Sequence, residues 1–180
     1  MKATGIVRRI DELGRVVIPK EIRKTLRIKE GDPLEIYTDR DELIFKKYSP
    51  LASIDNYAES VAQSLANTTE KTVFICDTDS VICGIGSGTK EIVEKNVSDE
   101  LGKLIRDKKS LVCNEADGGA MIEIAKGVAH EFRNILVIPV ISDDMAIGAI
   151  VLADKKKEGV MGTIEIKMSQ LASDFLSGKF

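Results

Sequence analysis

The pattern of β-branched, apolar and polar positions predicts a small β-rich module at the start of the chain. Thr4–Ile10 and Arg15–Ile18 are rich in β-branched residues and are predicted to form strands. Pro19 fits the first position of a short helix, where its missing N–H costs nothing. Leu34–Tyr37 and Leu43–Lys47 then pair as a hairpin.

After Tyr48-Ser49-Pro50 the pattern changes to helical spacing. Apolar residues recur at alternating steps of 3 and 4 along residues 51–65, and again along residues 164–175. Such a heptad seam is typical of a helix that packs against another helix. The two seams indicate either a helical bundle between subunits or two helices that pack on the sheet of their own domain.

Apolar runs between these helices predict strands, with turn-forming residues at 77–80 and 142–145. Helices fit Lys90–Lys95 and Asp99–Lys108, with Ser98 as the N-cap of the second. The segment Asn114–Arg133 has no clear period. This order predicts an α+β domain in which helices cover an antiparallel sheet. The predicted strands are Thr72–Asp77, Val81–Gly84, Ser110–Cys113, Ile135–Ile141 and Ala146–Ala153.

The first part of the chain is too short to bury a core of its own. Domains of about 50 residues without disulfides or a metal are marginally stable, and oligomerisation is a common remedy. We therefore expect residues 1–48 to dimerise, in an arrangement that could exchange strands between subunits.

Charge also separates the two parts of the chain, whose total formal net charge is -3. Residues 1–48 contain 12 Lys and Arg against 9 Asp and Glu, a net charge of +3. The remaining residues contain 14 basic and 20 acidic side chains, a net charge of -6. A basic first part, residues 1–48, which we call the head, is followed by an acidic second part. This indicates a polyanionic partner for the head, although basic residues on a surface that only contacts water would give the same charge.

Several classes of function lack the residues they need. The apolar runs are far shorter than the roughly 18 residues that span a bilayer, and the N-terminus resembles no secretion signal, so we expect a cytoplasmic protein. A structural zinc site is not expected, because the spacing of Cys76, Cys83 and Cys113 does not match that of zinc ligands and the chain has only one histidine, His130. The glycine-rich stretch 84–90 misses the phosphate-loop pattern. We assign no catalytic residue, metal site or cofactor.

Gly14–Arg23, followed by Leu26–Asp32, is the most specific motif in the chain. Together with Lys2–Arg8, it resembles the swapped-hairpin DNA-binding domain of the AbrB-like transition-state regulators. The order of elements after it is similar to that of the GAF class.

This resemblance implies an intertwined AbrB-like β-barrel dimer at residues 1–48 and a linker at 49–55. A GAF-like antiparallel sheet with flanking helices would follow at 56–180.

The resemblance also implies a sequence-tolerant regulator of sporulation-type gene expression that binds double-stranded DNA at the nucleoid. Arginine can form two parallel bonds to phosphate or guanine, whereas lysine keeps the charge without the planar fork. We expect Asp11 and Glu12 to shape the DNA-facing loop by pairing with nearby arginines. The basic residues matched to the family's DNA-binding surface are Arg8, Arg15, Arg23 and Lys24, with Lys2 and Arg9 as helpers.

The partners remain open at several points. The chain is expected to form a homodimer, or a homotetramer through the helices at 51–65 and 164–175. A GAF-class domain often binds a small molecule; the ligand is unknown here, and Asn114–Arg133 is the expected wall of its pocket. One alternative is an antitoxin. Another is a GAF-domain sensor or redox enzyme, using the three cysteines, in which the head only dimerises.

Overall fold

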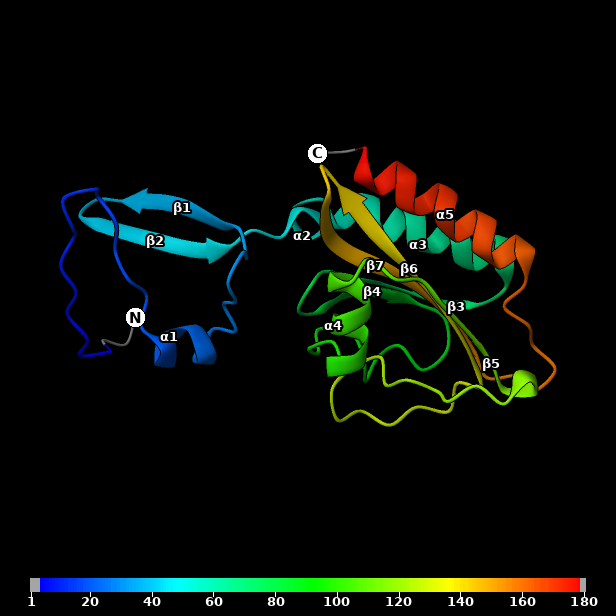
Figure 1. The fold of residues 1–180 in the computed structure, drawn as a ribbon. Coiled ribbons are helices and arrows are strands. Elements are labelled where there is room, and N and C mark those ends of the chain that lie inside the picture. The colour runs from blue at the N-terminus through cyan, green and yellow to red at the C-terminus, as the bar shows by residue number, and fades with distance from the viewer. Residues whose placement is uncertain (1–3, 179–180) are drawn as a thin grey trace. The chain divides into compact units, whose positions relative to one another are not determined.

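The computed structural model describes residues 4–178, and the chain divides into two compact units between Tyr48 and Ser49 (Figure 1). The first unit comprises residues 1–48 and the second residues 49–180. Within the described residues, no helix is both long and apolar enough to cross a membrane.

The first unit contains a short helix and a hairpin. Helix α1 spans Lys20–Thr25, and Pro19 occupies its N-cap, one position earlier than expected. Strand β1 (Leu34–Asp39) pairs antiparallel with β2 (Glu42–Lys47) in unbroken register. The predicted hairpin is confirmed, with a tighter turn in which Arg40 adopts a positive φ of 50°.

The strands predicted at Thr4–Ile10 and Arg15–Ile18 are not formed within residues 4–178. The segments meet where the Asp11 N–H donates to the Arg15 carbonyl, at 3.0 Å, which closes the loop between them. A strand exists through the ladder it forms with a neighbour, and this single chain pairs neither segment with one. The prediction was wrong for one chain because β-branched and apolar residues favour an extended strand without specifying its partner strand.

The second unit is built on an antiparallel sheet with the strand order β4-β3-β7-β6-β5. All the strands predicted for this unit are confirmed within one or two residues. Both predicted tight turns are present, and the second passes through Asp143 and Asp144 at positive φ. The strands are β3 (Thr72–Cys76), β4 (Val81–Ile85), β5 (Leu111–Asn114), β6 (Asn134–Ser142) and β7 (Met145–Asp154).

Helices lie on both faces of this sheet. Figure 1 shows α3 (Asp55–Thr69) and α5 (Thr163–Ser177) side by side over one face, and α4 (Asp99–Arg106) on the other. Ser98 caps α4 as predicted, accepting a hydrogen bond from the Leu101 N–H at 3.0 Å.

The helix predicted at Lys90–Lys95 is wrong, because this segment forms a series of turns. Its backbone groups bond to strand β4 instead: the Val81 N–H donates to the Lys95 carbonyl, and the Glu94 N–H donates to the Val81 carbonyl. Those bonds use the groups that a helix would need for itself.

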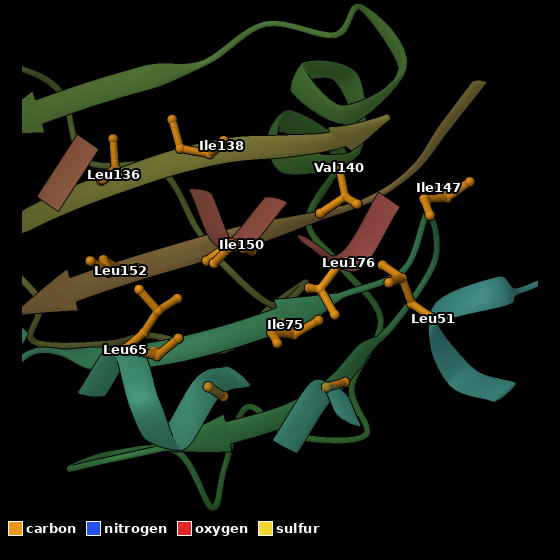
Figure 2. Close-up of a cluster of buried hydrophobic side chains, with 14 of the residues drawn as sticks. Leu51, Leu65, Ile75, Leu136, Ile138, Val140, Ile147, Ile150, Leu152 and Leu176 are labelled. Carbon is orange, nitrogen blue, oxygen red and sulfur yellow. The ribbon is translucent and has the colours of Figure 1, made fainter. Parts of the chain in front are cut away.

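Apolar side chains from the two faces of the sheet form two core layers. Leu136, Ile150 and Leu152 are fully buried against α3 and α5 (Figure 2). On the opposite face, Phe74 and Val137 pack with α4 and with residues 114–133. That segment contains a short 3-10 turn, η1 (Glu115–Asp117), and otherwise has no regular structure, but its residues Ile124 and Ala125 are fully buried in this layer.

The residues expected to form a linker pack into the second unit instead. Helix α2 spans Pro50–Ser53, and Leu51 is fully buried in the core (Figure 2). The Ser49 hydroxyl donates to the Asp77 carboxylate at 2.8 Å. On the other side of the same peptide bond, the Tyr48 N–H donates to the Pro33 carbonyl at 3.0 Å. Adjacent residues are therefore anchored in different units.

Candidate nucleic-acid interface

The first unit leaves most of its apolar side chains in contact with solvent. Val7, Leu13 and Val17 are 84%, 74% and 73% exposed, and Ile36 in β1 is 59% exposed. Among residues 4–48, Pro19 alone is buried. Burial of apolar surface is the main favourable term in folding, and exposed apolar patches mark interaction sites. This surface is therefore typical of one that a partner covers.

The basic residues predicted to bind DNA are exposed wherever the structure describes them. They come from the extended segment before the loop, from the residue that closes the loop, and from the last turn of α1. Lys2 lies outside the described residues. All the described members of the set lie at the surface of the first unit. In chain order, the set is Arg8, Arg9, Arg15, Arg23 and Lys24.

The side chain of Asp11 organises the loop that leads to Arg15. Its Oδ1 accepts hydrogen bonds from the N–H groups of Leu13 at 3.0 Å and Arg15 at 2.8 Å, and its Oδ2 accepts one from the Nε of Arg15 at 2.8 Å. Gly14 completes the loop with a φ of +74°, which side-chain-bearing residues rarely adopt.

These bonds also stabilise the charged form of Asp11. Hydrogen bonds from the backbone and then the side chain of Arg15 lower the pKa of Asp11, so its carboxylate stays ionised to a lower pH than that of an aspartate without such bonds. The expectation that Asp11 pairs with an arginine is confirmed. Glu12, expected to share that role, is exposed and forms no hydrogen bond or ion pair within the described part of the chain.

In the second unit, the seam predicted along 164–175 faces outward. Ile164, Leu171 and Phe175 of α5 are 68%, 64% and 49% exposed, while Ala172 and Leu176 pack on the sheet. The helix therefore carries apolar side chains on its outer surface as well as on the face that packs on the sheet.

The seam predicted along 51–65 behaves differently. It is interrupted at Ile54, between α2 and α3, and Ala58 and Leu65 are buried against the sheet. This helix therefore packs on its own domain, which was the second alternative. Tyr57 and Val61 of α3 face α5 across an apolar groove of about 470 Å³. The groove is lined by Tyr57, Ser60, Val61, Ser64, Leu65, Thr68, Met168, Leu171, Ala172 and Phe175.

Two further hollows, of about 450 and 690 Å³, lie along the irregular segment 114–133. Both are lined by His130, Glu131, Phe132 and Lys155. Lys155 already pairs with Glu131 at 3.2 Å. His130 accepts the Phe132 N–H at its Nδ1 and places its Nε2 2.9 Å from a backbone carbonyl. These polar groups are largely satisfied within the protein, so the hollows do not indicate the chemistry of a ligand.

Cys76 and Cys113 lie in surroundings that do not favour a reactive thiol. Burial raises the pKa of Cys76, which is completely enclosed, and also raises the pKa of Cys113. Since the thiolate is the reactive form, both environments disfavour thiol chemistry near neutral pH. The Cys113 thiol donates to the Ala120 carbonyl at 3.1 Å.

Two family models match the chain in tandem. Residues 53–180 match the stage V sporulation protein T C-terminal transcription factor model, and residues 7–52 match the model for antidote-toxin recognition MazE, a bacterial antitoxin. The chain is 42% identical over 178 residues to stage V sporulation protein T of Bacillus subtilis (strain 168), covering 98% of this chain and 97% of that protein. The chain belongs to the stage V sporulation protein T family.

The two units of this stage V sporulation protein T family member have separate relatives. Over 50 residues the chain is 66% identical to transition state regulatory protein AbrB of Bacillus subtilis (strain 168), covering 28% of this chain and 52% of AbrB. The GAF domain of an Acinetobacter phosphoenolpyruvate-protein phosphotransferase shares the second fold, with a TM-score of 0.54 at 13% identity over 71% of this chain and 86% of that structure. The predicted AbrB-like head followed by a GAF-like α+β domain is confirmed.

Sequence reasoning missed the polar rim of the α3–α5 groove. Ser60, Ser64 and Thr68 recur every four residues along α3, and each hydroxyl donates to the carbonyl four positions earlier. That spacing was visible in the sequence and places small side chains with satisfied hydroxyls along one helix face. Such a face allows close approach without leaving a polar group unpaired.

Proposed function

We propose that this protein is a homo-oligomeric transcription regulator of sporulation-type gene expression that binds double-stranded DNA with little sequence preference. The names of its relatives support this, because the full-length relative is a sporulation protein and the model matched by the second unit is that of a transcription factor. DNA binding is assigned to residues 1–48, acting at the nucleoid. Oligomerisation and sensing are assigned to residues 56–180, with 49–55 as the connection.

One observation carries the proposal: the head exposes a basic set and its own apolar side chains together. Val7 and Val17 lie within two residues of Arg8 and Arg15 in the chain and are 84% and 73% exposed. A second copy that covers the apolar residues would stabilise the head and present each basic residue twice. Exchange of the extended segments between copies would also supply the ladder that a single chain lacks.

The charge of such a dimer predicts how its affinity depends on salt. With four phosphate contacts from each subunit, about eight counterions are released, which gives a log–log slope of affinity against salt of roughly -7. Phosphate contacts position a protein without reading sequence, so tolerance of many sequences is expected.

The test is a salt titration of the full-length protein on a long promoter-derived duplex, followed by fluorescence anisotropy, with light scattering for mass. A steep negative slope and a dimer or tetramer are expected. Arg15→Ala and Arg23→Ala should each weaken binding and reduce the slope by about 2 in a dimer, since each lost contact counts twice. Arg106→Ala, which removes an exposed arginine from α4, is the matched control and should bind as the wild type does.

A salt-independent or absent interaction with DNA would reject the proposal. Equal losses in Arg106→Ala and Arg15→Ala would show that net charge matters, and not the head surface.

We further propose that the α3–α5 groove receives the same groove of a second copy, giving a tetramer. Pairing between copies from different head dimers would join two dimers, and once the first pair of grooves has met, the second pair forms at a raised effective concentration. The exposed seam of Leu171 and Phe175 on α5 would pack against its counterpart as in other paired helices.

Leu171→Glu should therefore halve the mass measured by light scattering, because it places a charge in the apolar seam. Gln170→Glu adds the same charge to an exposed neighbouring position outside the groove and should leave the mass unchanged. An unchanged mass in Leu171→Glu would exclude this interface.

A sensing role for the second unit rests on the hollows beside segment 114–133. A small molecule that binds there should raise the melting temperature of the wild type but not that of Phe132→Ala, which removes a shared wall. A metabolite library that produces no shift would leave oligomerisation as the function of this unit.

The antitoxin alternative draws on the family model matched by residues 7–52. Against it, residues 53–180 match a transcription factor model and form a packed domain, whereas antitoxins of this kind usually append a short disordered tail. The regulator is therefore the better-supported function.

A further inference from the structure

We infer that Asp11 positions Arg15 for DNA, so that a negatively charged residue strengthens binding to a negatively charged partner. The inference rests on the proposed DNA-binding function and adds a positioning residue to it. Asp11 itself need not touch the DNA.

The geometry of the loop carries this inference. Asp11 accepts bonds from both the backbone N–H and the side-chain Nε of Arg15, each at 2.8 Å. The Asp11 carboxylate therefore fixes both the backbone position of Arg15 and the orientation of its guanidinium group. Because Nε is used, the two terminal amino groups of the fork are left to donate to a partner.

The loop is also closed at the level of the backbone. The Asp11 N–H donates to the Arg15 carbonyl at 3.0 Å, and the Gly14 N–H donates to the Asp11 carbonyl at 2.9 Å. Arg15 is thus tied at its N–H, its carbonyl and its side chain to one residue. Its side chain nevertheless remains 70% exposed, so the tether does not remove it from solvent.

Two physical effects of Asp11 on DNA binding have opposite signs. As an exposed charge among many basic neighbours, it repels phosphate, and its removal should strengthen binding. As a tether, it spares Arg15 the loss of rotamer freedom on binding, and its removal should weaken binding. The tether is expected to dominate, because repulsion between exposed charges is screened at physiological salt.

The expected size follows from the number of copies. Pre-ordering one long side chain raises the affinity roughly two- to tenfold, and in a dimer this factor applies once for each subunit. Asp11→Asn should therefore weaken DNA binding by about tenfold, since an amide oxygen can still accept the backbone N–H bonds but its NH₂ group cannot accept from Nε. Asp11→Ala removes all three side-chain bonds and should weaken binding at least as much.

Glu12→Gln provides the matched control. It removes the same charge from the adjacent exposed position, where the described chain shows no hydrogen bond to the carboxylate. Full-length variants are compared by anisotropy on one duplex at fixed salt, and light scattering verifies that their oligomeric state is unchanged. Weaker binding by Asp11→Asn beside unchanged or stronger binding by Glu12→Gln is the expected pair of results.

The double variant Asp11→Asn with Arg15→Ala separates positioning from a general effect on the fold. If Asp11 acts through Arg15, the asparagine has no further weakening effect once Arg15 is absent. Stronger binding by Asp11→Asn, or a full additional loss in the double variant, would overturn the inference. Failure of the wild type to bind DNA would instead reject the proposed function, so the two failures are distinguishable.

Discussion

Individual polar side chains hold the irregular parts of the second unit in place. Asn134, fully buried, accepts the Glu115 N–H at 3.1 Å and donates to the Lys156 carbonyl at 2.8 Å, which joins the ends of two loops. Asp154 is 7% exposed, pairs with Lys71 and accepts the Lys156 N–H at 2.9 Å. Gly159 lies so close to this carboxylate that no larger residue fits, because a Cβ at position 159 would lie 2.3 Å from Asp154 Oδ2.

Asp154→Asn should destabilise the second unit by about 2 to 4 kcal/mol, because it leaves the mostly buried Lys71 without its counter-charge. Urea unfolding at pH 7 measures this loss. Glu131→Gln, which breaks the more exposed pair with Lys155, is the control and should cost less than about 1 kcal/mol.

The same pair predicts a dependence on pH. Burial alone would raise the pKa of Asp154, but hydrogen bonds from Lys71 and Lys156 outweigh it and lower the pKa. A carboxylate with a lower pKa in the folded state contributes its full stability above the unfolded pKa of about 4 and loses it as the pH falls. The difference between wild type and Asp154→Asn should therefore shrink below about pH 4, and a constant gap would contradict this account.

Residue-scale features were predictable only where the partner is nearby in sequence. Ser98 was recognised as a cap because the group it bonds lies three residues on. The exposure of the arginines followed from the density of charge around them. The Lys71–Asp154 pair was not predictable, because 83 residues separate its members and only the sheet brings them together.

At the scale of elements, the sequence predicted which segments form strands and helices better than it predicted which elements pack or pair with each other. The runs that became β3, β6 and β7 are apolar enough to be buried on both faces, so few alternative structures existed for them. The strands expected at Thr4–Ile10 and Arg15–Ile18 are also rich in β-branched residues, but they pair with no neighbouring strand within the described chain. Heptad spacing likewise predicted α5 without deciding which of its faces meets the sheet.

Two buried serines of α5 test how well the face of this helix that packs on the sheet satisfies its polar groups. Ser169 and Ser173, one turn apart, are both buried, but the Ser173 hydroxyl donates to the Pro139 carbonyl at 2.8 Å, whereas Ser169 Oγ has no partner within the described chain. Ser169→Ala should stabilise the domain by about 1 kcal/mol, and Ser173→Ala should destabilise it by a similar amount. Thermal unfolding of the two variants measures both effects, and shifts of the same sign would refute the distinction.

At the scale of the whole molecule, stability is distributed unequally. The second unit encloses two apolar layers, whereas the first has a single buried residue, Pro19, among those described. The head's order should therefore depend on the concentration of partner chains, while the second unit's core should not.

Hydrogen exchange on a dilution series measures this difference. In the Leu171→Glu variant, which removes the proposed second contact, each tenfold dilution should lower the protection of the head by up to about 1.4 kcal/mol per dimer. Protection of β6 and β7 should stay constant. Equal behaviour of both units would mean that the head is stable as a monomer.

The junction at Tyr48 and Ser49 has a mechanical consequence. Tyr48 is bonded to Pro33 in the first unit, and Ser49 is bonded to Asp77 in the second. No flexible residues therefore lie between these two anchored positions. Pro50 further narrows the torsions open to Ser49. Any relative movement of the units must therefore be a rotation about a few backbone bonds and not a change in tether length.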